Sequence, residues 1–133
     1  MSLGKIVKIQ ECYDFESDQN NRSKFDGYII TTDSDTIKIG ISNYQQCCES
    51  WGYLSSEDNL EKFIGSNLND ILVVDKALKV YQPFREISED DAIFVNLLTN
   101  RGTLQFVVYN EHNGFYGHRV IVESKTFNLK SRI

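Results

Sequence analysis

Residues 45–52 place two adjacent thiols, Cys47 and Cys48, near the expected start of a helix. A cysteine acts as a nucleophile or metal ligand only as the thiolate, and a helix N-terminus lowers the pKa of a thiol. The competing interpretation is a core-facing helix with an apolar stripe at positions i, i+3, i+4 and i+7. That stripe consists of Tyr44, Cys47, Cys48 and Trp51. Free cysteine is among the most buried residue types, so core packing is the favoured interpretation.

Residues 109–118 contain both histidines of the chain, His112 and His118. Tyrosine, asparagine and histidine side chains offer hydrogen-bonding groups that suit a polar ligand. The candidate ligand-binding residues are Tyr109, His112, Asn113, Tyr116 and His118. The competing interpretation is a hairpin turn in which Asn113-Gly114 makes the corner.

Together the two segments allow two kinds of reactive site. Cys48, His112 and His118 could ligate a metal, although zinc takes four ligands and the CxxC and HExxH spacings are absent. Cys48 as nucleophile with His112 as base would make a Cys–His enzyme. The sequence has no phosphate loop, dinucleotide fingerprint or G-x-S-x-G elbow. The sequence therefore does not decide whether the protein is an enzyme or whether it binds a metal or a cofactor.

The two segments also carry a resemblance. Gln-Gln-Cys-Cys-Glu-Ser-Trp-Gly (45–52) followed by Tyr-Asn-Glu-His-Asn-Gly-Phe-Tyr-Gly-His (109–118) resembles a family of uncharacterised small proteins from bacteriophages and bacteria. Its members pair a QQCCE…G segment with a YNxHNGYYxH segment. The resemblance implies a phage or prophage origin and a shared purpose for both segments, but no activity. Phe115 stands where the family more often has tyrosine.

The elements that would position these residues are mostly strands. Apolar runs and turn residues predict strands over residues 5–15, 28–32, 36–42, 71–74, 77–81, 92–99, 103–110 and 119–124. Two short helices are expected, over 43–52 with Asn43 as cap and over 56–64 ending before Gly65. The prediction is an α+β fold, mainly β, with an antiparallel, meander-like sheet and the helices packed against it. A barrel-like closure of the sheet is the alternative.

Two parts of this sheet have the clearest patterns. Ile37, Ile39 and Ile41 alternate with polar or small residues, as in a half-buried strand. Residues 92–99 and 103–110 form a predicted hairpin, with Gly102 at the loop position that favours positive φ. Both strands have apolar residues on each face, which predicts a central, covered position.

Composition bounds the class of protein. The chain has 133 residues, one proline and an ordinary hydrophobic fraction of 41%, which indicates one globular domain over residues 1–133. A net charge of −5 makes a nucleic-acid partner unlikely, and Lys125, Lys130 and Arg132 are interpreted as a solvated terminus. No apolar run reaches the roughly 20 residues of a membrane span. Three cysteines, two of them adjacent, favour a reducing cytoplasmic location.

These observations rank the functions. The leading hypothesis is a small non-enzymatic binding or interaction domain with a protein or small-molecule partner of unknown identity. The Cys–His enzyme and the metal-binding domain are the alternatives. A homodimer through exposed sheet edges is compatible with the chain, although no residue specifies one.

Overall fold

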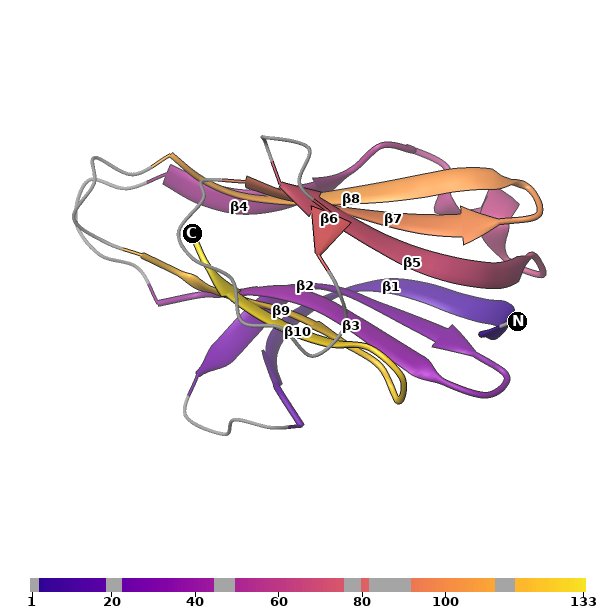
Figure 1. The fold of residues 1–133 in the computed structure, drawn as a ribbon, viewed down its shortest axis with the longest axis horizontal. Helices are drawn as coiled ribbons and strands as arrows, with labels where there is room; N and C mark the ends of the chain where they lie inside the picture. The colour runs from indigo at the N-terminus through magenta and orange to yellow at the C-terminus, as the bar shows by residue number, and fades with distance from the viewer. Residues whose placement is uncertain (1–2, 19–22, 45–49, 76–79, 82–91, 112–116) are drawn as a thin grey trace.

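The computed structural model describes residues 3–18, 23–44, 50–75, 80–81, 92–111 and 117–133 (Figure 1). Within them the chain forms ten β-strands and one short 3-10 turn. The strands are β1 (Gly4–Glu16), β2 (Lys24–Thr32), β3 (Thr36–Ser42), β4 (Ser50–Ser55), β5 (Asn67–Asp75), β6 (Val80–Tyr81), β7 (Ala92–Thr99), β8 (Gly102–Glu111), β9 (Arg119–Glu123) and β10 (Asn128–Arg132). The turn is η1 (Leu60–Phe63).

The predicted α+β class is wrong, and the first expected helix shows why. Its described residues from Ser50 onward belong to strand β4, while residues 45–49 lie outside the described part. Trp51 and Tyr53 both pack against the core, and Gly52 separates them, so the segment follows a two-residue period. Pairing with β8 satisfies that period, so tertiary pairing outweighs the helical spacing of the Tyr-Cys-Cys-Trp stripe.

The second expected helix is reduced to η1. Asn59 caps it by accepting a hydrogen bond from the Glu61 amide at 3.2 Å, and Phe63 anchors it in the core. Ile64 is already extended, with ψ of 129°, so the helical geometry stops after one turn. In the described part of the chain, no helix is long and apolar enough to cross a lipid bilayer.

The strands form one antiparallel sheet in the order β10-β9-β3-β2-β1-β5-β7-β8-β4, with β6 beside β5. Figure 1 shows that this sheet is folded into two layers, with β1, β2, β3, β9 and β10 below and β4 to β8 above. β10 and β4 stand at the ends of the hydrogen-bonded order. The sheet is therefore open, and the barrel-like alternative is also wrong.

β1 belongs to both layers. It pairs with β2 along most of its length, whereas Gly4 pairs with Leu68 of β5. Ile6 continues this junction, because its amide donates to the Ser66 carbonyl at 2.8 Å and its carbonyl accepts from the Gly65 amide at 2.7 Å. The two layers are thus held together by backbone hydrogen bonds at this corner.

The core lies between the layers and is built by alternation. Ile37, Ile39 and Ile41 are buried, which confirms the predicted inward face of β3. The upper layer contributes the inward residues of β7 and β8, among them Val95, Leu97, Leu104 and Phe106. The predicted hairpin is also confirmed, since Thr99 pairs with Gly102 and Gly102 has φ of +114°.

The end of β1 crosses beneath the lower layer. A β-bulge falls between Cys12 and Phe15, and Asp14 within it has φ of 55°. Beyond the bulge, the Phe15 ring lies so close to Gly40 that a Cβ there would approach it to 2.6 Å. Ser17 then donates to the buried carboxylate of Glu123. Bulges bend strands in this way, and the bend covers the outer face of β3 and β9.

Candidate functional site

The two segments singled out in the sequence lie side by side. β4 pairs with β8 so that Ser50 lies opposite Glu111, and Trp51 lies opposite Asn110. The described parts of residues 45–52 and 109–118 are therefore neighbours at the end of the sandwich where β3 and β8 end and β4 and β9 begin. We call this the histidine end, because His118 lies there.

A pair of rings in a tilted contact joins the two layers at the histidine end. The Trp51 and His118 ring centroids are 4.9 Å apart, with their planes 35° from parallel. His118 is 1% exposed, and its Nδ1 lies 2.6 Å from the backbone carbonyl of Ser42. A carbonyl only accepts, so Nδ1 must carry the proton in this contact. The hydrogen bond places a proton on Nδ1 and fixes the orientation of the ring.

The last strand completes this junction. The backbones of His118 and Ile133 exchange two hydrogen bonds of 2.7 and 2.9 Å. The buried side chain of Asn110 crosses from β8 and donates to the Ile133 carbonyl at 3.1 Å. Buried polar groups with defined partners fix geometry, so these hydrogen bonds hold the described residues of the junction in one arrangement.

Tyr109 has a structural contact. It lies directly across from Gly52 in the β4–β8 pair. A Cβ on Gly52 would come within 2.7 Å of the Tyr109 hydroxyl oxygen. An aromatic ring over a cross-strand glycine stabilises a sheet edge, which explains why a glycine stands at this position of β4.

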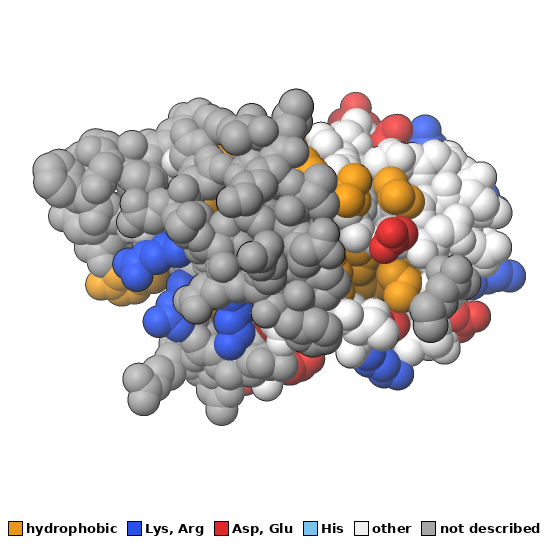
Figure 2. Space-filling view, viewed as in Figure 1, with side chains coloured by type: hydrophobic (Ala, Val, Ile, Leu, Met, Phe, Trp, Pro, Cys, Tyr) orange, Lys and Arg blue, Asp and Glu red, His pale blue; other side chains and the backbone are white. Residues whose placement is uncertain are grey.

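A basic patch lies beside the histidine end. It consists of Arg119, Lys130 and Arg132, all exposed. Arg132 lies directly opposite Arg119 in the β9–β10 pair, and Lys130 is the next residue on that face of β10. Figure 2 shows Lys and Arg side chains gathered over β9 and β10. Among the described residues, every ion pair involves some other lysine.

This patch revises the interpretation of the tail as a solvated terminus. Lys130 and Arg132 belong to an ordered strand, not to a frayed end. Lys125 lies at the opposite end of that strand pair, where its ammonium donates to the Ser34 carbonyl at 2.8 Å. The sequence alone could not place Arg119 opposite Arg132, because that contact depends on the register of β10.

Only some of the predicted site residues are described. Tyr109 and His118 are present as above, while Cys48, His112, Asn113 and Tyr116 lie outside the described residues. Cys48 and the two histidines therefore stay a prediction as metal ligands, and so does the Cys48–His112 pair. In the described ranges, no group of three or more His, Cys, Asp or Glu side chains is arranged to hold a metal ion.

Cys12 is the cysteine that the structure does describe, and it is a free thiol. Burial raises the pKa of this thiol, and the charge of Glu11 adds to the increase, while Lys8 opposes it. Because a nucleophilic cysteine needs a lowered pKa, Cys12 is not an activated thiol.

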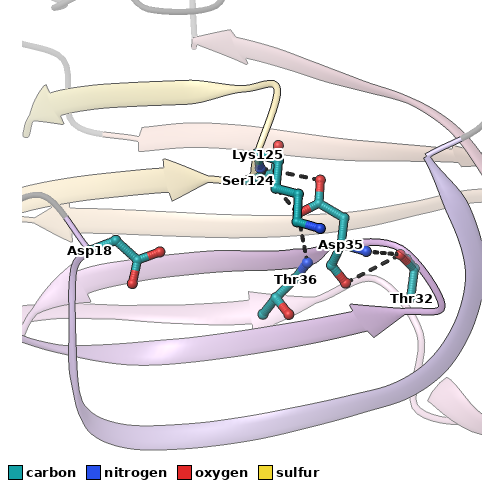
Figure 3. Close-up of a pocket in the computed structure, with 6 residues that line it drawn as sticks. All are labelled: Asp18, Thr32, Asp35, Thr36, Ser124 and Lys125. Carbon is teal, nitrogen blue, oxygen red and sulfur yellow. Dashed lines mark hydrogen bonds between the residues drawn. The ribbon is translucent and has the colours of Figure 1, made fainter.

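A hollow of about 390 Å³ lies at the other end of the sandwich (Figure 3). We call this the turn end, because the β2–β3 and β9–β10 turns form it. The hollow is lined by Asp18, Thr32, Asp35, Thr36, Ser124 and Lys125. The Asp35 carboxylate already accepts from the backbone amides of Thr36 at 2.7 Å and Lys125 at 3.1 Å. Thr32, Asp35 and Lys125 thus bind backbone groups of the two turns, so much of the polar lining of the hollow already serves turn structure.

Comparison with known families identifies the chain's relatives. The model of a family described as a domain of unknown function, DUF7448, matches residues 1–122. Neither the search of curated proteins nor the search of solved structures finds a match. The match covers β1 to β8 and most of β9, including both segments of the histidine end. The chain belongs to this family, DUF7448.

Proposed function

We propose that the protein is a small, non-enzymatic binding domain that contacts an acidic partner protein through the basic patch at its histidine end. The observation that carries the proposal is the direct opposition of Arg119 and Arg132 on β9 and β10. Like charges directly opposite one another destabilise a strand pair. A carboxylate-bearing surface would neutralise both guanidinium groups, so binding would remove this repulsion.

The neighbouring junction supports the same proposal. A binding surface is most effective when its backbone is already ordered, because ordering on contact costs free energy. Arg119 follows His118 directly, and its backbone amide donates to the Ser42 hydroxyl at 3.0 Å. The guanidinium of Arg132 lies close to Gly117, where a Cβ would come within 2.7 Å of its Nε. Both arginines thus extend from a fixed base.

Arginine also suits the proposed partner chemically. A guanidinium presents a planar set of donors that matches a carboxylate in a bidentate arrangement. We expect the partner to be a protein and not a nucleic acid, because the patch holds three basic side chains on a chain with net charge −5.

The setting of the protein is part of the proposal. The paired motifs at the histidine end support a phage or prophage origin, and the free thiol of Cys12 suits a reducing cytoplasm. Genome neighbourhoods test the origin. We expect genes for this family to lie within phage or prophage regions, and a scatter among ordinary chromosomal genes would contradict this.

The experiment is a pull-down from nuclease-treated host lysate with three forms of the protein. The wild type is compared with Arg119→Glu/Arg132→Glu and with Lys5→Glu/Lys8→Glu, which changes the net charge equally at exposed lysines of β1. We expect one acidic protein to be retained by the wild type and the lysine variant and lost by the arginine variant. Equal retention by all three forms, or none above background, would refute the proposal.

A further inference from the structure

A second surface, separate from the basic patch, lies along the outer edge of β4. β4 is the last strand of the hydrogen-bonded order, and within the described residues only β8 pairs with it. An edge strand presents backbone N–H and C=O groups that can pair with another chain. The six residues of β4 are Ser-Trp-Gly-Tyr-Leu-Ser, with no charge and no proline. Leu54 is 48% exposed.

The other open edges have features that discourage pairing, as natural sheets commonly do. β10 carries the charges of Lys130 and Arg132. β1 beyond Ile6 is interrupted by its bulge, where Asp14 adopts positive φ. In contrast, β4 has no such protection in its own sequence, which makes it the edge most suited to accept a strand.

A cluster of one carboxylate and two phenols, Glu11 with Tyr13 and Tyr53, lies next to this edge. The phenol groups of Tyr13 and Tyr53 both donate to Oε2 of Glu11, at 2.8 and 2.7 Å. The hydrogen bond to Glu11 raises the pKa of Tyr13; burial and then the same hydrogen bond raise the pKa of Tyr53. Both phenols therefore remain protonated donors at neutral pH. Glu11 is exposed, and Tyr13 is 66% exposed.

We infer that β4 accepts an extended strand from a partner protein, and that this strand directs an arginine or lysine toward Glu11. A strand added to β4 would lie about 4.8 Å from it, with the residue opposite Tyr53 at a Cβ separation of about 5 Å. A basic side chain at that position reaches the Glu11 carboxylate. Its cation can also lie against the exposed ring of Tyr13.

The charge of the cluster distinguishes this partner from a second copy of the protein. In a symmetric pairing of two β4 strands, the strand facing Glu11 would be Ser-Trp-Gly-Tyr-Leu-Ser, which offers no cation. Isologous pairing would thus leave the carboxylate without its complement. A basic strand from another protein supplies it.

Trp51 makes the test direct, because it is the single tryptophan of the chain and lies in β4. The probe is the peptide acetyl-Thr-Val-Thr-Arg-Thr-Val-Thr-amide, titrated while tryptophan fluorescence is recorded. In one control peptide, glutamine replaces the arginine. The other control peptide keeps the arginine and carries N-methyl groups at alternate residues. We expect saturable binding of the probe, about tenfold weaker binding of the glutamine peptide, and none of the methylated peptide.

Variants of the protein locate the binding. Glu11→Gln should weaken binding of the arginine peptide by about the same tenfold factor. Binding of the glutamine peptide should not change, because only one charge pair is removed. Leu54→Lys should abolish binding by charging the edge, whereas Val7→Lys, at a residue of β1 that is 51% exposed, should not. Urea unfolding of each variant verifies that it is folded.

Three results would overturn the inference. One is equal binding of the arginine and glutamine peptides, and another is equal binding of the methylated peptide. The third is a wild-type dimer in sedimentation equilibrium that Leu54→Lys dissociates, since a second copy would then occupy the edge.

Discussion

The two ends of the sandwich use polar residues in opposite ways. At the turn end, Asp35, Thr32 and Lys125 bind backbone groups of the two turns that they connect. At the histidine end, the polar groups of His118 and Asn110 are buried between the layers, while Arg119 and Arg132 extend outward from them. The turn end thus contains the hollow, but the histidine end contains the two opposed, exposed arginines.

Thr32 and Asp35 at the hollow are therefore less available to a ligand than the two arginines of the histidine end. Side chains that already serve turn geometry have little hydrogen-bonding capacity left for a ligand. Side chains that repel one another in the free protein are stabilised when a complementary charge binds between them. If the two ends differ in this way, removal of an exposed charge should stabilise the protein at the histidine end and slightly destabilise it at the turn end.

The largest effect is expected for His118→Leu at the histidine end. The variant removes the ring N–H that donates to the Ser42 carbonyl, and it removes the imidazole ring that packs against Trp51. We expect the free energy of unfolding to fall by about 2–4 kcal/mol. Urea denaturation measures it. A loss below about 1 kcal/mol would mean that this junction is not a rigid base.

The next effect is expected for Thr32→Val at the turn end. The Thr32 hydroxyl accepts from the Asp35 amide at 2.8 Å and donates to the Leu3 carbonyl at 2.9 Å. Valine keeps the shape but loses both bonds, so the free energy of unfolding should fall by about 1–2 kcal/mol. Thr36→Val, at an exposed residue of the same turn, is the matched control and should change stability little. An equal loss in both variants would contradict the assigned role.

A smaller effect of opposite sign is expected for Arg132→Gln. Removing one of two opposed guanidinium groups should raise the free energy of unfolding by about 0.5 kcal/mol at low ionic strength. High salt should abolish the gain because it screens exposed charges. Arg119→Gln added to Arg132→Gln should give no further gain. Destabilisation by Arg132→Gln at low salt would contradict the repulsion assigned to Arg119 and Arg132.

The smallest effect is expected for Lys125→Ala at the turn end. The exposed ammonium of Lys125 makes one hydrogen bond to the Ser34 carbonyl, so its removal should cost at most about 0.5 kcal/mol. Capture of the acidic partner should not change. A loss of partner capture comparable to that of the arginine variant would move the binding surface to the turn end.

The sequence predicted the parts of the fold that depend on local pattern. Ile37, Ile39 and Ile41 alternate, and Gly102 marks the hairpin corner, so both were identified correctly. The helix expected over residues 43–52 failed because Trp51 fits a helical stripe and a strand equally well, and only pairing with β8 decides between them. β10 was missed because Leu129 is its one strongly apolar residue.

The candidate site was predicted only in outline. The paired motifs suggested that residues 45–52 and 109–118 serve one purpose, and the β4–β8 pair places their described parts together. The sequence did not predict the contacts made by Ser42, Asn110 and Arg132. Their contacts with His118, Ile133 and Gly117 join distant parts of the chain, so they follow from sheet order and not from spacing.

The pairing of β3 with β9 has a consequence for synthesis. Lys38 pairs with Glu123, so β3 lacks its second neighbour until β9 has been made. Chains emerge from the ribosome N-terminus first, and β1, β2 and β3 can pair with one another early. Arg119, Lys130 and Arg132 take their places only afterwards. A chain that stops before β9 therefore lacks the basic patch, and the proposed partner contact would form only after β10 has been made.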